Sequence, residues 1–194
     1  MKLQNQNNAG FTLVELLVTL IILGIVIAFA VPSFQTMATS NRMTNQVNTL
    51  SGLIANARSA ASTAPGSTVT ICSSSDGASC SGSSNWEDGW IVFRDEDGDG
   101  SVDAGDGDEV LRVHADLAGG NTLRVTGFDG SGQRIQFEGN GMPSASAGSA
   151  GAGTLTVCDD GGVSDAGAIV VAVSGQTRLV RNGLDHDGNA ITCP

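Results

Sequence analysis

The first third of the chain is an apolar run followed by an amphipathic helical pattern. Residues 16–34 carry no charged side chain and show no polar stripe. As a helix they would be about 28 Å long, close to the hydrocarbon thickness of a bilayer. Apolar residues then recur at helical spacing on a polar background, at Met37, Met43, Val47, Leu50 and Ile54. We therefore expect a helix surrounded by lipid or by partner helices, followed by an amphipathic helix over residues 40–61.

Two proline positions shape this predicted helix. Pro32 lies inside the pattern, where it removes one backbone hydrogen bond and bends the helix. The Ala-Pro-Gly sequence of residues 64–66 ends the helix.

From Ser67 onwards the pattern changes to short β-rich runs separated by Gly, Ser, Asp or Asn. These runs are residues 69–72, 90–94, 110–114, 123–127, 135–137, 154–158, 169–173 and 177–181. Eight short strands with no helical pattern between them predict antiparallel sheets packed on the helix, and thus an α+β fold. The low-complexity residues 144–153 predict a loop.

A secretory signal peptide is one alternative for the apolar run. Residues 28–30 read Ala-Phe-Ala, the form of a signal-peptidase site. Two features oppose this interpretation: Lys2 is the only basic residue ahead of the run, and an acid, Glu15, stands at its start.

The start of the run carries a family resemblance. Residues 10–15 read Gly-Phe-Thr-Leu-Val-Glu, which resembles the class III prepilin signal of type IV pilins and type II secretion pseudopilins. The resemblance implies that a prepilin peptidase cleaves between Gly10 and Phe11 and that Phe11 is N-methylated. Glu15 then becomes the fifth residue of the mature chain, where it pairs with the α-amino group of a neighbouring subunit's Phe11. A carboxylate at the edge of an apolar run requires such a partner.

The resemblance also implies an organisation and a location for the chain. Residues 1–10 are the leader peptide, and residues 11–34 are the transmembrane and filament-core helix. Residues 35–64 are an amphipathic helix, and residues 65–194 form a globular β domain. The chain is expected to cross the bacterial inner membrane once, with its C-terminal domain in the periplasm, before it enters a pilus or pseudopilus filament.

Further motifs narrow the family. Residues 56–61, Asn-Ala-Arg-Ser-Ala-Ala, resemble the helix end of H-type minor pseudopilins and of FimT/FimU-type minor pilins. The resemblance to this family extends to residues 69–80, 86–93, 111–114, 153–159 and 174–175. The resemblance implies a long helix packed on a two-sheet β domain, and other pilin or pseudopilin subunits as partners. It favours a minor pilin near the filament tip that helps to initiate assembly, with a minor type II secretion pseudopilin as the alternative.

The four cysteines all follow the apolar run. An even number of cysteines in a translocated domain predicts disulfides, and three pairings of Cys72, Cys80, Cys158 and Cys193 are possible. In one of them Cys72 and Cys80 close a short loop, which leaves Cys158 to join Cys193. A zinc site is disfavoured because no C-x2-C pair occurs.

Charge is concentrated in one strip of the chain. The sequence has 9 Lys and Arg against 20 Asp and Glu, a formal net charge of −11. Ten of these acids, against Arg94 alone, lie in residues 87–109. An acidic surface argues against nucleic-acid binding, but here only within this strip.

The strip contains a candidate cation site. Residues 95–106 read DEDGDGSVDAGD, and their acids match ligand positions of the twelve-residue calcium loop. The candidate ligands are Asp95, Asp97, Asp99, Asp103 and Asp106. However, Asp106 replaces the usual bidentate Glu, and strands rather than helices flank the loop. A bound Ca²⁺ and a solvated acidic turn both remain open.

A DNA-binding role is the other alternative. FimT-type pilins that bind DNA share a C-terminal Gly-Arg-x-Arg pattern, which Gly175 and Arg178 match, but Gln176 stands in place of the first arginine. Arg178 and Arg181 are three residues apart, so a regular strand would place them on opposite faces. DNA is thus a possible partner that the sequence does not favour.

No catalytic motif accompanies these features. The chain has no nucleophile elbow, phosphate-binding loop or metalloprotease helix. His114 has no recognisable partner, and His186 lies in an acidic turn without a nucleophile motif. We therefore do not expect an enzyme.

Overall fold

A computed structural model of the chain describes residues 11–64, 66–128, 134–145, 151–159, 166–181 and 183–193. The chain divides into two compact units, Met1–Ser40 and Asn41–Pro194. One long helix, α1 (Leu13–Thr63), passes from the first unit into the second. The apolar N-terminal segment (residues 11–34), which we call the stem, and the amphipathic helix predicted from the sequence are therefore parts of one element.

The described part of the first unit is the N-terminal part of α1. The helix begins directly after Thr12, whose hydroxyl accepts a hydrogen bond from the Glu15 backbone N–H at 3.2 Å, an N-cap arrangement. The helix continues through Pro32 without interruption, and the Thr36 hydroxyl donates to the Pro32 carbonyl at 3.1 Å. Every residue from 11 to 34 is exposed, so this apolar surface requires lipid or other helices around it.

The second unit contains two four-stranded antiparallel sheets. The first has the order β3-β2-β1-β5, from β3 (Glu109–His114), β2 (Trp90–Asp95), β1 (Thr68–Ser73) and β5 (Arg134–Phe137). The second has the order β4-β6-β7-β8, from β4 (Thr122–Gly127), β6 (Gly153–Cys158), β7 (Gly167–Val171) and β8 (Thr177–Arg181). A short 3₁₀ helix, η1 (Ala118–Gly120), lies between β3 and β4. The predicted α+β class and the eight predicted strands are confirmed.

Both boundaries of one strand, β7, were predicted wrongly by two residues. The sequence pattern placed a strand over residues 169–173, whereas β7 ends at Val171. The reason is a turn, in which the Ala172 N–H donates to the Gln176 carbonyl at 2.9 Å and the Gly175 N–H donates to the Ala172 carbonyl at 2.8 Å. At its other end β7 begins at Gly167, which pairs with Arg181 of β8.

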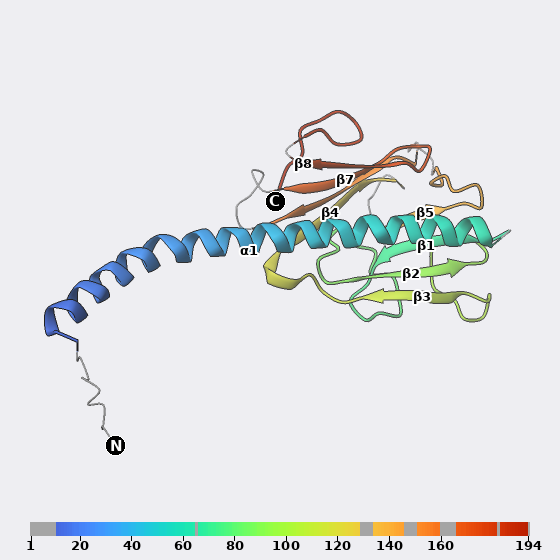
Figure 1. Cartoon of the computed structure of the whole chain (residues 1–194). Helices are drawn as coiled ribbons and strands as arrows, with labels where there is room; N and C mark the ends of the chain where they lie inside the picture. Colours follow the sequence, from blue (N-terminus) through green and yellow to red (C-terminus); the bar gives the residue numbers. More distant parts are fainter. Residues whose placement is uncertain are drawn as a thin grey trace, which may run out of the picture. The chain divides into compact units, whose positions relative to one another are not determined.

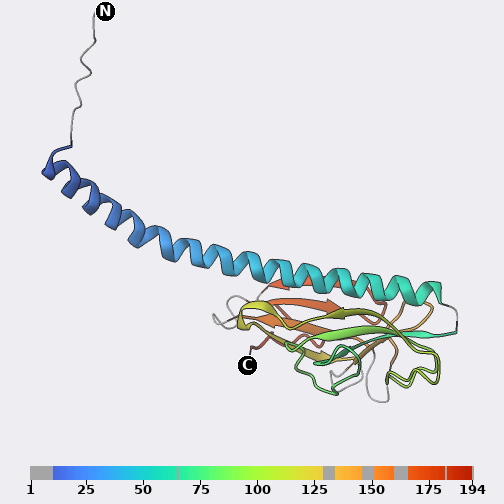
Figure 2. The same cartoon turned by 90° about the horizontal axis from the view of Figure 1, so that it is seen from below.

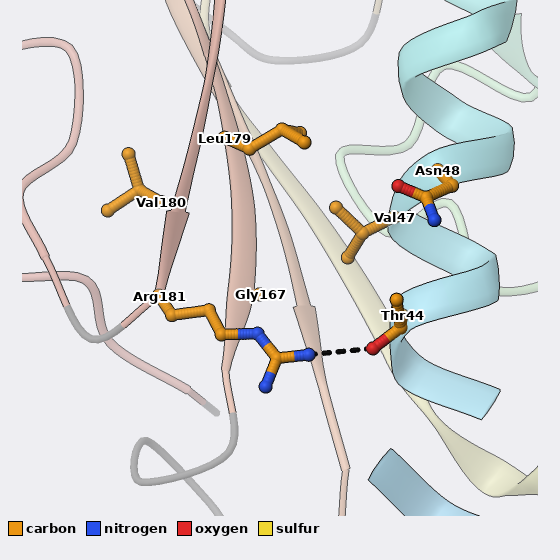
Figure 3. Close-up of a pocket in the computed structure, with 7 residues that line it drawn as sticks. All are labelled: Thr44, Val47, Asn48, Gly167, Leu179, Val180 and Arg181. Atoms are coloured by element: carbon orange, nitrogen blue, oxygen red, sulfur yellow. Dashed lines mark hydrogen bonds between the residues drawn. The ribbon is translucent and has the colours of Figure 1, made fainter. Parts of the chain in front are cut away.

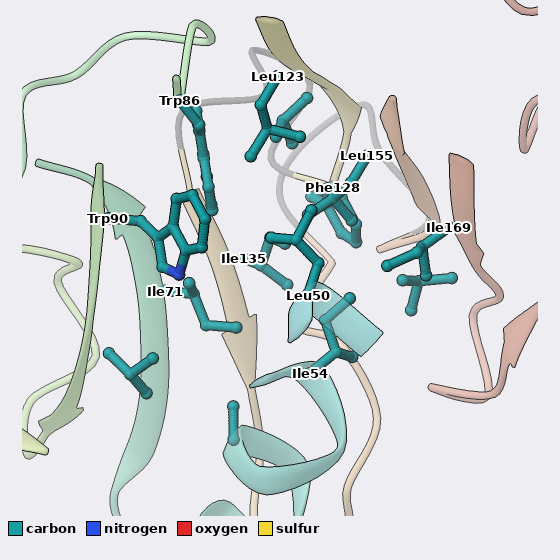
Figure 4. Close-up of a cluster of buried hydrophobic side chains, with 14 of the residues drawn as sticks. Leu50, Ile54, Ile71, Trp86, Trp90, Leu123, Phe128, Ile135, Leu155 and Ile169 are labelled. Carbon is teal, nitrogen blue, oxygen red and sulfur yellow. The ribbon is translucent and has the colours of Figure 1, made fainter. Parts of the chain in front are cut away.

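Residues 41–63 of α1 lie across both sheets (Figures 1 and 2), and one apolar stripe of this helix packs into the core. The buried residues of this helix are Met43, Val47, Leu50, Ile54, Ala57 and Ala61. Figure 4 shows Leu50 and Ile54 among side chains of both sheets, and neither has any exposed surface. The predicted amphipathic helix is confirmed, although Met37, which fitted the same spacing, is 56% exposed. All buried hydrophobic residues among those described lie at Met43 or beyond, so the second unit encloses its own core.

The end of α1 is attached to two turns by Arg58. Its Nε donates to the Gly141 carbonyl at 2.7 Å, and an Nη donates to the Ser174 carbonyl at 3.3 Å. Gly175, with a φ of +73°, lies against this guanidinium, and a Cβ there would come within 2.8 Å of the Arg58 Nε. Only glycine combines this conformation with such a close approach. Residues 56–61 and 174–175, which the sequence offered as separate motifs, thus form one contact.

Two disulfides join Cys72 to Cys80 and Cys158 to Cys193, with Cα–Cα distances of 5.6 and 5.9 Å. This is one of the three pairings that the sequence left open. The first bond closes the loop after β1. The second joins β6 to the C-terminal segment, where Cys158 packs with Ala166, Ala168 and Ile191.

We expect the two disulfides to contribute unequally to stability. They join residues 8 and 35 positions apart, and the chain-entropy model assigns them about 2.5 and about 4 kcal/mol. Urea unfolding of a chain that begins at Asn41 should show the larger loss for Cys158→Ser with Cys193→Ser. The matched comparison is Cys72→Ser with Cys80→Ser, and equal losses would contradict the prediction.

The Cys72–Cys80 loop is organised by Asp76. The Ser79 hydroxyl donates to one carboxylate oxygen at 2.6 Å, and the N–H groups of Ala78 and Ser79 donate to the other at 2.8 Å each. The Ser74 hydroxyl adds a bond of 3.0 Å. These donors, the Ser79 hydroxyl first, hold the pKa of Asp76 far below its ordinary value of 3.8.

This shift predicts a pH-dependent contribution to stability. Because the folded-state pKa is lowered, the ionised carboxylate stabilises the folded unit above pH 3.8, and that contribution is lost as the pH falls below this value. The destabilisation caused by Asp76→Asn should therefore be largest at neutral pH and shrink towards pH 2, measured by urea unfolding. Asp116→Asn, at an exposed acid, is the control and should show no such trend.

Candidate functional site

The predicted processing and assembly residues lie at the start of the stem. Gly10 is outside the described residues. Phe11 is 85% exposed and precedes the helix, and Glu15 lies in the first turn of α1. Leu13, Val14, Leu16 and Leu17, which surround Glu15 in the sequence, are all exposed apolar residues. Glu15 is therefore an acid within an apolar surface, which is the arrangement that a paired intramembrane carboxylate requires.

The length and composition of the stem fit a membrane span. Within the described residues α1 is the one helix long and apolar enough to cross a bilayer, and none of its most apolar 18-residue window is buried. A core helix of a soluble protein can be equally long and apolar, but most of its surface would be buried. The exposed surface of the stem is thus available to lipid or to neighbouring stems.

Residues 96–108, which we call the acidic loop, lie between β2, which ends at Asp95, and β3. The predicted ligands Asp95, Asp97 and Asp99 come together, with one carboxylate oxygen from each within 4.8 Å of the others. Asp103 and Asp106 are not part of this group. Instead, the Asp106 N–H donates to the Asp103 carbonyl at 3.1 Å, within a turn.

Asp95 has a structural role that the sequence did not reveal. Its side chain is fully buried, and its two carboxylate oxygens accept four hydrogen bonds. The donors are the Thr70 hydroxyl at 2.7 Å, the Gly98 N–H at 2.7 Å, the Gly100 N–H at 3.1 Å and the Gln136 amide at 3.1 Å. Asp95 therefore joins β1, β5 and the loop, and its oxygens are already occupied by protein donors.

The predicted calcium site accordingly fits only in part. Of its three grouped acids, Asp97 and Asp99 are exposed and each accepts one backbone N–H, whereas Asp95 is buried and its carboxylate already accepts four hydrogen bonds from the protein. Calcium binding stays a prediction of the sequence. Titration of the Asn41–Pro194 unit with millimolar Ca²⁺ should release or absorb heat if the prediction is right, and Asp97→Asn with Asp99→Asn should abolish that heat. A titration without heat would contradict it.

The two predicted DNA-binding arginines do not form one patch. The Arg181 guanidinium donates to the Thr44 hydroxyl of α1 at 2.7 Å. β8 pairs regularly with β7, so Arg178, three positions earlier, lies on the opposite face of the strand. Both arginines are exposed. This arrangement agrees with the alternation expected from the sequence.

Both histidines have packing partners. The His114 ring stacks on Trp90 with 3.9 Å between the ring centroids. The His186 Nδ1 lies 3.0 Å from the Thr154 hydroxyl, whose oxygen also accepts the His186 N–H. The His114 partner was not recognisable from the sequence, because Trp90 becomes its neighbour only through the pairing of β2 with β3.

Comparison with known proteins places these features in a family. The family model described as "Type II transport protein GspH" matches residues 46–177, more than half of the chain. The chain belongs to the GspH family. A second model, the prokaryotic N-terminal methylation motif, matches residues 5–31. This GspH-family chain is therefore a membrane-anchored minor pilin or pseudopilin, a class of structural subunits that assemble with other pilins after processing by a prepilin peptidase.

Solved structures support the fold of this GspH-family protein. Two crystal forms of the type IV minor pilin FimU from Pseudomonas aeruginosa match with TM-scores of 0.52 and 0.54. They are 17% and 18% identical, and the matches cover 71% and 74% of this chain and 92% of each FimU chain. At this identity the similarity shows the pilin-like fold. A search of curated protein sequences finds no match.

Proposed function

We propose that this chain is a minor type IV pilin that helps to initiate pilus assembly near the filament tip. The observation that carries the proposal is an apolar stem that bears an acid and lies within the match to the methylation motif, joined to a folded unit that resembles the minor pilin FimU. We call this unit, Asn41–Pro194, the head. Such a stem has no stable place except a membrane or a bundle of similar helices. The same molecule can therefore reside in the membrane before assembly and then enter a filament.

The two disulfides support a location for the head. Disulfides persist in oxidising compartments such as the bacterial periplasm, and all four cysteines lie in the Asn41–Pro194 unit. We infer that the stem is anchored in the inner membrane with the head in the periplasm. Cleavage after Gly10 would then expose the Phe11 amine, which pairs with Glu15 of a neighbouring subunit.

A second candidate is a minor pseudopilin of type II secretion, favoured by the description of the matching family model. A deletion strain separates the two. Under our proposal it loses surface pili, secretes exoproteins normally, and regains pili when the full chain is supplied. Normal pili with lost secretion would support the pseudopilin instead. Natural transformation, measured in the same strain, tests the DNA-binding alternative.

A further inference from the structure

A groove lies between α1 and β3, at the edge of the first sheet. It has a volume of about 480 Å³, and its lining residues come from these two elements and, for Trp90 alone, from β2. We call it the β3 groove. Leu53 of α1 and Leu111 of β3 pack against the core but stay partly exposed, and the Trp90 ring stacks on His114 beside them. The groove therefore has an apolar floor and a rigid aromatic wall.

The pairing of β3 with β2 directs Arg112 towards α1. Arg112 lies opposite Val92, and His114 lies opposite Trp90. Val92 and Trp90 both belong to the core cluster that includes the buried residues of α1. Side chains that are directly opposite in an antiparallel pair lie on the same face of the sheet, so Arg112 is on the α1 face, where it lines the β3 groove.

Arg112 gives the groove an uncompensated positive charge. Among the described residues no carboxylate forms an ion pair with it, and Glu109, the acid on the same strand, is paired with Arg94. No acid is among the described lining residues, although the chain has 20 Asp and Glu against 9 Lys and Arg. A second groove, between α1 and β8, differs because its arginine, Arg181, already donates to Thr44 (Figure 3). The β3 groove therefore offers its cation to a carboxylate from outside.

Gly52 indicates that another chain comes close to this groove. It lines the groove from the interior of α1, where glycine is the least favourable residue after proline. A Cβ at this position would meet no atom within 4 Å, so nothing in the described part of the head requires a glycine here. A close approach by the backbone of a partner does require one.

The dimensions of the groove fit an extended segment. Asn48 and Asn56, which line it from α1, are both exposed and lie eight residues apart, about 12 Å of helix. This length matches about four residues of extended chain, and amide side chains can both donate to and accept from peptide groups. β3 pairs only with β2 within the described chain, and residues 66–128, which include both flanks of β3, are all described. A peptide can therefore lie between these asparagines and the outer edge of β3.

We propose that the β3 groove binds an extended acidic segment of a different filament subunit, whose carboxylate pairs with Arg112. An apolar neighbour of that acid packs on Leu53 and Leu111. The proposal rests on the proposed function, because a minor subunit that initiates assembly has to bind a subunit of another kind. A contact with an unlike partner does not repeat along the filament, which agrees with a position near the tip.

Photo-cross-linking of the full chain in the source bacterium tests this contact. A photoreactive phenylalanine analogue replaces Thr49, an exposed groove residue whose hydroxyl donates to the Asn45 carbonyl of its own helix. We expect a cross-link to a different chain that carries its own N-terminal methylation motif, with an Asp or Glu within about three residues of the attachment point. Cross-links to a second copy of this chain, to lipid, or to no macromolecule would overturn the proposal.

Charge variants test the role of Arg112. Arg112→Glu should lower the cross-link yield about tenfold, whereas Arg112→Lys, which keeps the charge, should retain most of it. Replacement of the acid in the cross-linked segment by Arg should restore the yield of Arg112→Glu, which a damaged fold would not do. A yield that Arg112→Glu leaves unchanged would count against the pairing and overturn the proposal.

Gly52→Leu tests the close approach. It should lower the cross-link yield about tenfold while raising the urea midpoint of a chain that begins at Asn41, because Leu is a better helix former than Gly and meets open space here. A loss of yield together with a gain in stability cannot be a folding defect. Ala55→Leu, at an exposed position of the same helix that does not line the groove, is the matched control and should leave the yield unchanged. An equal yield from Gly52→Leu would contradict the proposal.

Pili are counted in the deletion strain, which keeps this inference separate from the proposed function. Loss of pili on deletion, together with no cross-link at Thr49, would reject only the groove contact. A cross-link to an acidic segment of another subunit, in a bacterium that keeps its pili after deletion, would reject only the role in pilus assembly.

Discussion

Replacement of Glu15 by Gln should remove the chain from filaments while leaving it in the membrane. Glu15 lies in the first turn of a stem whose residues 11–34 are all exposed and, apart from Glu15 and a few small polar side chains, apolar. On entry into a filament these surfaces become covered by neighbouring helices, so the carboxylate must find a partner or remain unpaired in an apolar environment.

The expected effect of Glu15→Gln is large. Glu15→Gln removes the carboxylate but leaves the Phe11 ammonium of the neighbouring subunit without a counter-charge in the apolar helix bundle, and an unpaired charge inside a membrane costs about 3 kcal/mol on insertion scales. Loss of the pairing therefore predicts a roughly 100-fold lower incorporation. Immunoblots of sheared filaments and of membranes from the same cells measure this ratio.

A matched control exists in the same stem. Thr19→Val also replaces a polar group, but the Thr19 hydroxyl donates only to the Leu16 carbonyl of its own helix, at 2.8 Å. We expect this variant to be incorporated normally. Filaments that contain Glu15→Gln at the wild-type level would contradict the pairing, provided that mass spectrometry finds methylated Phe11 in both chains.

Replacement of Leu50 by Asp should prevent the Asn41–Pro194 unit from folding. Leu50 has no exposed surface and lies among core residues of both sheets (Figure 4). The change removes an apolar contact worth about 2–5 kcal/mol and buries an unpaired carboxylate, which costs several kcal/mol more. The sum is comparable with the whole stability of a typical domain, roughly 5–15 kcal/mol.

The same helix provides the control. Asn56→Asp introduces the same charge at an exposed position further along α1, and it should leave folding unchanged. Circular dichroism and proteolysis of a chain that begins at Asn41 distinguish the two outcomes. A folded Leu50→Asp variant would show that the helix is not the centre of this core.

Several features of the structure follow from local sequence patterns. The apolar run, the spacing from Met43 to Ile54 and the β-rich runs identified the helix and the eight strands, because amphipathic periodicity reports which face of an element is buried. The turn at Ala172 was the exception. The continuous apolar run past Val171 resembled strand, and only the hydrogen bond from Ala172 to Gln176 ends it there.

The acidic loop shows where sequence patterns were insufficient. Asp95 matched a calcium ligand by spacing, yet its carboxylate accepts bonds from Thr70 and Gln136, which lie 25 and 41 residues away. No local pattern reports such partners. The cysteine pairing could not be read from local sequence either. An even number of cysteines predicts disulfides, but the choice among three pairings depends on which strands become neighbours.

The sequence by itself determined the processing motif, the acid at the start of an apolar stem, and the division into one long helix and short strands. These features depend on residue types at short spacings, which act through local periodicity and charge. Only the tertiary structure decided the cysteine pairing, the burial of Asp95, the separation of Arg178 from Arg181, and the β3 groove. Each of these depends on strand order and on where α1 crosses the sheets, and such contacts between distant residues leave no local signal in the chain.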